Sequence, residues 1–307
     1  MDSSPGRDGG KPRIPVLAVL LSLGATGLGQ IYCGKLTKGL VLFFLSFAFA
    51  PIIVNTAAAS SSEWAPVAVI LSLALLFSVF LYAMADAYLL AKRERRGYQL
   101  KEYNRWYLYL LFVLVSTTYP ANLAHTIREQ ILQAYKIPSA SMVPNILPGD
   151  YVLLNKTVYR KRSPQIGEIV VFIPPSQRHS RHIKRIAALP GDTVEIKENK
   201  LRVNDRPVIF QPAGGIEGLD IRNTFPGKFI GEVNGEASYS IRLAKEPLAD
   251  FPKTTVPDGH CFLLGDNRPD SRDSRHFGPV PLADVKGRVD FIYYPAVSWK
   301  RFGWYRD

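Results

Sequence analysis

The chain has 307 residues, a formal net charge of +12 and 47% hydrophobic residues. Two cysteines are too few for a disulfide-stapled scaffold, and 11% aromatic residues together with long apolar runs exclude disorder and low complexity. The mean hydropathy of +0.01 suits a soluble protein, but it averages two unlike halves. Four long segments in the first half contain no Asp, Glu, Lys or Arg: residues 14–33, 39–60, 64–85 and 106–124.

These four segments predict transmembrane helices. About 20 apolar residues, each rising about 1.5 Å, cross the hydrocarbon core of a bilayer. The last three segments meet this criterion. The first contains Gly24, Gly27 and Gly29, so it forms either a span or a shorter re-entrant or interfacial segment. We therefore predict a membrane anchor of three or four helices over residues 1–125, and we favour four.

Basic residues predict the orientation of this anchor. Six Lys and Arg lie in residues 92–105, whereas residues 55–63 contain none. Because short cytoplasmic loops are enriched in Lys and Arg, we place residues 92–105 in the cytoplasm and the chain after about residue 125 outside it. The N-terminus lies outside with four spans, and inside with three spans and a re-entrant first segment.

The second half, residues 126–307, predicts a mostly-β domain. Short runs rich in β-branched and aromatic residues alternate with turn residues, including Gly-Asp pairs such as Gly265-Asp266. Residues 205–256 are richer in Gly and Pro and are interpreted as a peripheral inserted lobe. The expected strands are residues 151–154, 169–173, 193–197, 200–203, 239–242, 261–264 and 289–294.

Two common kinds of catalytic site are disfavoured. His179 and His182 are three positions apart, but no Cys or second His pair accompanies them, and a zinc site needs three or four such ligands. We predict no metal and no cofactor. The sequence has no G-x-S-x-G elbow and no alternating βα pattern, which disfavours a Ser-His-Asp hydrolase, although triads are finally recognised by geometry.

A candidate nucleophile follows the last apolar segment. Ser139 and Ser141 lie between Pro138 and Pro144, and proline stiffens the chain by fixing φ. A stiff, exposed serine just above a bilayer is well placed to act on a chain that emerges from it. The alternative is a plain linker.

Two later segments supply partners for such a serine. Lys184 lies in an apolar, strand-like stretch, and burial lowers the pKa of a lysine, so that the neutral amine becomes a general base. The alternative is a surface lysine on an alternating strand. Residues 265–275 combine Asp, Ser and Arg densely, which predicts a buried charge network and, as the alternative, an Asx-rich turn.

Taken together, these segments resemble type I signal peptidases, also called leader peptidases. The resemblance covers about residues 130–307 and implies a catalytic β domain of the signal peptidase I type, without a cofactor. It further implies a membrane-bound serine endopeptidase that removes N-terminal signal peptides from exported preproteins and cleaves after small residues, in an Ala-x-Ala pattern. Four blocks carry it, in order after the anchor: PSASMVPN, GDYVLLNK, HIKRIAALPGD and GDNRPDSRDSR.

The resemblance assigns catalytic roles residue by residue. It makes Ser141 the nucleophile and Lys184 the general base. The backbone N–H of Ser141 and the hydroxyl of Ser139 form the oxyanion hole, and Ser271 orients the lysine amine. These assignments are implied by the family pattern and not by spacing.

It also assigns supporting and substrate-binding residues. Asp273 and Arg275 form a supporting ion pair, with Arg185 close by. Asn145 departs from the family, which often has Thr at this position, and His182 stands where Tyr is common. The residues that fall on the substrate subsites are Tyr135, Ile137, Pro138, Met142, Ile146, His182 and Ile183.

The expected location is the bacterial cytoplasmic membrane, with several spans and an extracytoplasmic catalytic domain. Expected partners are preprotein signal peptides, membrane lipid and the protein translocation machinery. Self-cleaving repressors share a related Ser/Lys fold but are soluble, which the apolar segments exclude. A non-catalytic scaffold with a degenerate site is a further alternative, against which intact Ser141, Lys184 and Ser271 argue. Nucleic-acid binding is disfavoured, because the densest basic cluster faces anionic lipid.

Overall fold

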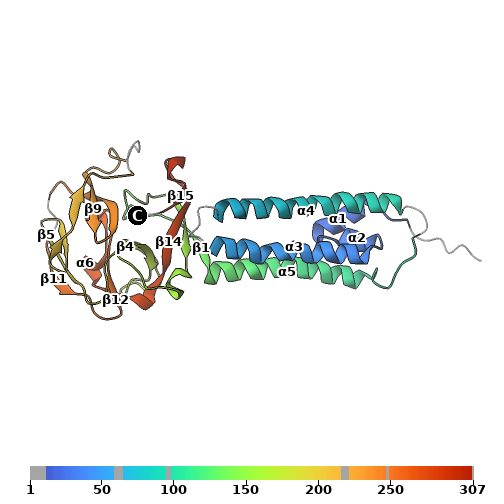
Figure 1. Ribbon diagram of the computed structural model, residues 1–307, viewed down its shortest axis with the longest axis horizontal. Coiled ribbons are helices and arrows are strands. Elements are labelled where there is room, and N and C mark those ends of the chain that lie inside the picture. The colour runs from blue at the N-terminus through green and yellow to red at the C-terminus, as the bar shows by residue number, and fades with distance from the viewer. Residues whose placement is uncertain (1–11, 59–64, 95–97, 216–220, 247–248, 306–307) are drawn as a thin grey trace, which may run out of the picture. The chain divides into compact units, whose positions relative to one another are not determined.

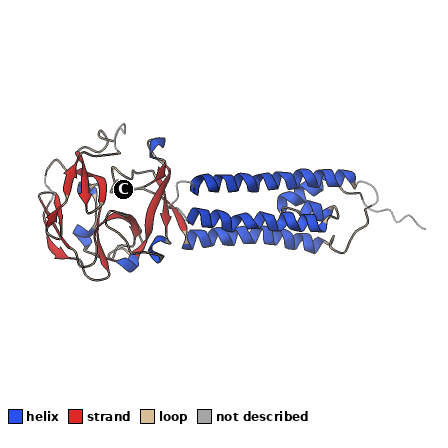
Figure 2. Ribbon diagram, in the orientation of Figure 1, coloured by secondary structure: helices blue, strands red, loops and turns tan. Residues whose placement is uncertain are grey.

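The structure is a computed structural model that describes residues 12–58, 65–94, 98–215, 221–246 and 249–305. The chain divides into two compact units, Met1–Ile127 and Arg128–Asp307 (Figure 1). Helices build the first unit and strands dominate the second (Figure 2). In the predicted outer loop, residues 55–63, the positions from 59 onward lie outside the described residues.

The first unit contains five helices. Two segments, Ile70–Arg93 and Trp106–Gln130, are long and apolar enough to cross a membrane, judged by length and composition. These results support membrane association, whereas the number of spans stays a prediction. The helices are α1 (Pro15–Gly24), α2 (Leu28–Tyr32), α3 (Leu36–Ala58), α4 (Ala65–Arg93) and α5 (Trp106–Gln130).

The first apolar segment, residues 14–33, is broken into two helices. Its longer piece, α1, has ten residues and is therefore about 15 Å long, half the thickness of a hydrocarbon core. Gly27, at φ +91°, turns the chain into α2, and a Cβ there would lie 2.1 Å from the carbonyl oxygen of Gly39. The break exists because only glycine permits this conformation and this close approach to α3.

Polar side chains fasten the broken segment to the longer helices. Asp86 on α4 forms an ion pair with Lys38 at 2.6 Å and accepts a hydrogen bond from Gln30 at 3.1 Å. Asn104, in the chain before α5, donates to the carbonyl oxygen of Ile31 at 3.0 Å. The α1–α2 turn therefore lies at the end of the bundle that also holds the chain between α4 and α5.

The second unit is mostly β, as predicted. Its main sheet is antiparallel in the order β1-β2-β14-β3-β4-β12-β13, with β15 paired to β14. The strands are β1 (Leu132–Lys136), β2 (Tyr151–Asn155), β3 (Ile169–Phe172), β4 (His182–Ala188), β12 (His260–Leu264), β13 (Val280–Pro281), β14 (Val285–Tyr294) and β15 (Gly303–Trp304).

Two smaller sheets complete this unit, and they divide the segment 205–256. Its middle forms a three-stranded sheet, but both of its ends pair with strands outside the segment in a four-stranded sheet. The segment is thus less separate than a peripheral lobe. The strands are β8 (Ile209–Gln211), β9 (Lys228–Asn234) and β10 (Ala237–Leu243), then β5 (Thr193–Lys197), β6 (Lys200–Val203), β7 (Arg206–Pro207) and β11 (Phe251–Thr255).

Strand β4 lies inside the main sheet and positions the site. Lys184 is opposite Val170 of β3, and Arg185 is opposite Leu264 of β12. Six of the seven β4 residues are buried, because neighbouring strands cover both edges and apolar clusters cover both faces. A strand buried on all sides carries its polar side chains into the protein interior.

Candidate active site

Ser141 lies in a turn that follows β1. Main-chain hydrogen bonds hold the chain around it: the N–H of Ile137 donates to the carbonyl of Asp150 at 2.8 Å, and the N–H of Asn267 donates to the carbonyl of Ser141 at 3.1 Å. Ser141 is buried, and its hydroxyl oxygen lies 3.2 Å from that of Ser139. The two hydroxyls of the PSASMVPN block are therefore neighbours in space.

Lys184 reaches Ser141 from β4. Its Nζ donates to Ser141 Oγ at 2.7 Å and to the carbonyl oxygen of Ile183 at 2.8 Å. The side chain is 3% exposed, so the alternative of a surface lysine is wrong. Burial lowers the pKa of the Lys184 amine from its usual 10.5 to about 8, and the carboxylates of Asp273 and Asp266 offset only part of this effect.

Ser271 lies beside this pair, but the hydrogen bond that the family resemblance implies is not formed. The Ser271 Oγ atom is buried and has no hydrogen-bond partner within the described part of the chain. Gly265 allows the segments to approach, because a Cβ there would lie 2.1 Å from Ser271 Oγ and 2.6 Å from the carbonyl oxygen of Ser141. Sequence analysis treated Gly265 as part of a turn and missed this role.

The 265–275 segment forms the predicted charge network, and Arg185 joins it through Asp266. Asp273 pairs with Arg275 at 2.7 Å and accepts a hydrogen bond from the N–H of Gly265 at 2.9 Å. Burial alone would raise the pKa of Asp273, but the hydrogen bond and charge of Arg275 outweigh it and hold this pKa below its usual value. Arg185 binds Asp266, through two bonds of 2.8 Å, and not the Asp273–Arg275 pair.

A third buried ion pair involves the segment 205–256. Glu232 on β9 is fully buried and binds Arg268 at 2.6 Å. The hydroxyl of Tyr239 donates a hydrogen bond to Glu232 at 2.9 Å. The guanidinium of Arg185 lies over the Tyr239 ring, 4.0 Å from the ring centroid, in a cation–π contact. Sequence analysis missed these residues, since it found no motif in this segment. A charged residue, Glu232, next to the apolar residues Ile230 and Val233 is the signal that could have identified them.

Apolar side chains and the Ser141–Lys184 pair line one pocket of about 380 Å³. Most of the predicted subsite residues lie here. Arg181 closes one side by donating to the hydroxyl of Tyr135 at 2.9 Å. The residues that line it include Tyr135, Ile137, Pro138, Ser139, Ser141, Val171, Arg181, His182, Ile183, Lys184, Asp270 and Arg272.

Met142 and Ile146 are the two predicted subsite residues that do not line this pocket. The N–H of Ile146 donates to the carbonyl of Met142 at 3.0 Å, which closes the turn between the two residues. Both are fully buried in the apolar cluster with Val152 and Leu154. They support the floor of the site from within the core.

Histidine does not add a metal site to the pocket. Burial, and next the charge of Lys184, lower the pKa of His182. No cluster of three His, Cys, Asp or Glu side chains that could hold a metal ion occurs in the described ranges.

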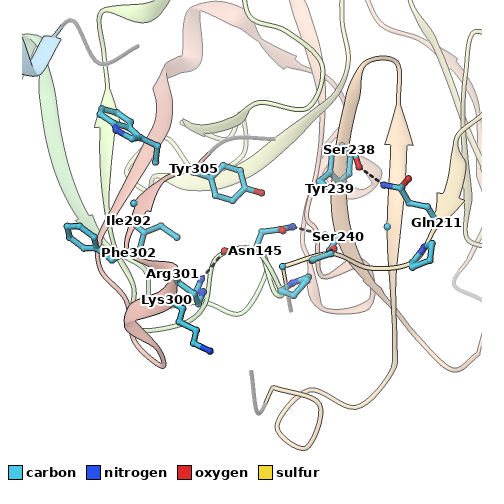
Figure 3. A pocket seen from close by; sticks show the side chains of 17 residues that line it. Asn145, Gln211, Ser238, Tyr239, Ser240, Ile292, Lys300, Arg301, Phe302 and Tyr305 are labelled. Carbon is cyan, nitrogen blue, oxygen red and sulfur yellow. Dashed lines mark hydrogen bonds between the residues drawn. The ribbon is translucent and has the colours of Figure 1, made fainter. Parts of the chain in front are cut away.

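A separate polar pocket of about 450 Å³ lies beside the charge network (Figure 3). It shares no lining residue with the Ser141 pocket. Asn145 connects the two regions, because its amide donates to Asp266 and to the carbonyl of Ser240, each at 2.6 Å. Arg301 donates to the carbonyl of Asn145 at 2.9 Å, which fixes the turn that follows Ser141.

Comparison with known proteins gives consistent matches. Residues 108–294 match the family described as signal peptidase, peptidase S26. Signal peptidase I of Aquifex aeolicus is 36% identical over 55% of this chain and 78% of its own length. Signal peptidase I of Rickettsia typhi is 30% identical over 60% of this chain and 80% of its own length. Signal peptidase I of Pseudomonas aeruginosa is 30% identical over 65% of this chain and 73% of its own length. A signal peptidase I crystal structure from Enterococcus faecalis is 31% identical, covers 41% of this chain and 97% of its own, and has a TM-score of 0.27.

Gly265→Ala tests the close approach at the site. The added methyl group would overlap Ser271 Oγ and the Ser141 carbonyl, and we expect the displaced Ser141 to react about 10²-fold more slowly with a serine-acylating probe. The control is Gly214→Ala, since a Cβ at Gly214 meets no atom within 4 Å. Equal acylation rates for the two variants would contradict this explanation.

Glu232→Ala tests the buried ion pair. It leaves the Arg268 guanidinium buried without its partner, which we expect to cost about 3–5 kcal/mol of the free energy of unfolding. Thermal unfolding of the full chain in detergent measures the loss. The matched control is Lys253→Ala, which breaks the exposed pair with Asp205 and is expected to cost less than about 1 kcal/mol. Similar losses in both variants would argue against a structural role for Glu232.

Proposed function

This chain belongs to the signal peptidase family, peptidase S26, and from that premise we propose that it removes N-terminal signal peptides from exported preproteins. As a member it is a serine peptidase, a hydrolase. The finer proposal is a Ser/Lys dyad formed by Ser141 and Lys184. The observation that carries it is the 2.7 Å contact between Lys184 Nζ and Ser141 Oγ, in a buried position that favours the neutral amine.

In the proposed mechanism, neutral Lys184 accepts the Ser141 hydroxyl proton while Ser141 Oγ attacks the carbonyl carbon of the scissile peptide. The tetrahedral oxyanion accepts hydrogen bonds from the Ser141 N–H and the Ser139 hydroxyl. Collapse breaks the C–N bond, and the leaving amine takes the proton from Lys184. Lys184 then deprotonates a water molecule that hydrolyses the acyl-enzyme ester and restores Ser141.

We propose that the enzyme cleaves after small residues of the Ala-x-Ala kind. Ile137, Pro138 and Ile183 line the Ser141 pocket together with Val171. This apolar pocket of about 380 Å³ lies near the lower end of the range for ligand sites. Small apolar side chains one and three positions before the cut suit such a pocket.

We propose a multi-pass location in a bacterial cytoplasmic membrane, with the catalytic unit outside the cytoplasm. The half-length α1 supports three spans and a re-entrant first segment, rather than four spans. Asn104, within the basic loop at 92–105, donates a hydrogen bond to Ile31 in that re-entrant segment. Both therefore belong on the cytoplasmic side, where anionic lipid attracts the loop. The translocation machinery is a further proposed partner.

Substitution of the dyad tests the proposed chemistry. We expect Ser141→Ala and Lys184→Met each to lower kcat for cleavage of an Ala-x-Ala preprotein by about 10⁴-fold or more, because dyad members act as a unit. Ser176→Ala and Lys200→Met are the controls, since both residues are exposed and neither lines the Ser141 pocket. Retained activity in either dyad variant would refute the dyad.

The pH dependence tests the role of Lys184 as a base. Its amine is neutral above a pKa of about 8, so we expect kcat/KM of the free enzyme to fall about tenfold per pH unit below pH 8 and to level off above it. Asp270→Asn removes a negative charge that raises the Lys184 pKa, and should therefore move the midpoint to lower pH. A profile that is flat between pH 6 and 8 would contradict the assignment.

A further inference from the structure

An apolar groove opens in the membrane unit where α1 ends. In Figure 1, α1 and α2 occupy one end of the bundle, whereas α3, α4 and α5 continue past them. The groove has a volume of about 810 Å³. Its walls come from all four of the longer helices, with Leu23, Gly24, Phe47, Leu76, Phe80 and Leu123 among the lining residues.

The composition of this groove suits a helix better than a lipid tail. Among the described residues, none of the 17 that line the groove is charged, and six of them are small. Helix–helix interfaces in membranes are enriched in such residues, because they permit close backbone approach and interhelical hydrogen bonds. A lipid tail needs neither. The six are Gly24, Ala25, Thr26, Ser46, Ser116 and Ala124.

Pro120 leaves a backbone carbonyl without its helical hydrogen bond in the groove wall. It lies inside α5 and has no N–H, so the usual helical hydrogen bond to the carbonyl of Ser116 cannot form. Both residues line the groove. A carbonyl freed in this way is satisfied in membranes by groups from a neighbouring helix.

The length of the groove matches one kind of segment. Along α5 it is lined from Ser116 to Ile127, which corresponds to about 16 Å of helix. The apolar core of a secretory signal peptide has about 7–15 residues, or about 10–22 Å as a helix. A full transmembrane helix of about 30 Å would be too long.

The order of sites along the chain matches the order of parts in a signal peptide. Ile127 lines the groove, and Tyr135, eight positions later, lines the Ser141 pocket. One residue, Ile131, separates α5 from β1. In a signal peptide the apolar core is likewise followed closely by the small residues at the cleavage site.

We propose that this groove binds the apolar helix of the signal peptide, so that the membrane unit is a second substrate-binding site. This inference rests on the proposed function. The groove recognises an uncharged helix of about ten residues by close packing. It contributes to substrate binding, whereas Ser141 and Lys184 perform the chemistry.

Photocrosslinking tests occupancy. A benzophenone amino acid replaces Leu73, which lines the groove, or Leu71, which is 64% exposed and does not line it. The full chain carries Ser141→Ala to retain the uncleaved preprotein and is held in phospholipid vesicles. We expect a preprotein adduct from position 73 and none from position 71. Adducts with phospholipid alone at position 73, or equal preprotein adducts at both positions, would overturn the proposal.

Filling the groove tests its contribution to binding. Ala124→Trp blocks the groove, and Leu114→Trp on the same helix, outside the groove, is the control. For a complete preprotein we expect Ala124→Trp to raise KM about tenfold. For a peptide that spans the cleavage site but lacks the apolar core, KM should stay unchanged. An unchanged KM for the preprotein, or equal losses on both substrates, would refute the groove site. Failure of the unmodified chain to cleave either substrate would instead refute the proposed function.

Discussion

The proposed chemistry depends on one constraint: an uncharged amine has to be held in a position poor in water beside the Ser141 hydroxyl. Burial inside β4 disfavours the charged form of Lys184. The surrounding charges must not cancel this effect, since a nearby carboxylate without a counterion would restore the proton. Asp266 and Asp273 therefore each have a guanidinium partner. The guanidinium groups of Arg185 and Arg275 offset the negative charges of Asp266 and Asp273 near Lys184, and the same ion pairs join separate segments of the chain.

The same ion pairs connect parts of the chain that are far apart in sequence. Arg185 and Asp266 are 81 positions apart, and Glu232 and Arg268 are 36 apart. Each pair is almost fully buried, so removal of one member leaves the other charge buried without a partner. The segment 205–256, which has no catalytic motif, thus helps to hold the segment that packs against Ser141. Its role is structural support for the chemistry.

Local patterns in the sequence predicted several of the strands and the mostly-β second half, and the family motifs implied the pairing of Ser141 with Lys184. Strands β1, β4 and β9 were not among the expected strands. Partner choice among similar groups could not be predicted in this way. The Arg185–Asp266 pair, the buried positions of Met142 and Ile146, and the role of Glu232 all depend on which segments the fold brings together. Length and hydropathy also could not show that the first apolar segment is broken, since the break depends on contact between Gly27 and Gly39.

The burial of Lys184 has a consequence for enzyme populations. With a pKa of about 8, the amine is neutral at pH 7 in about one molecule in ten. In the proposed mechanism, molecules with a protonated Lys184 are inactive. A bound peptide that covers the pocket would remove the remaining water around Nζ and shift this equilibrium toward the neutral form. Substrate binding would then raise the fraction of molecules in which the Lys184 amine is neutral and can activate Ser141.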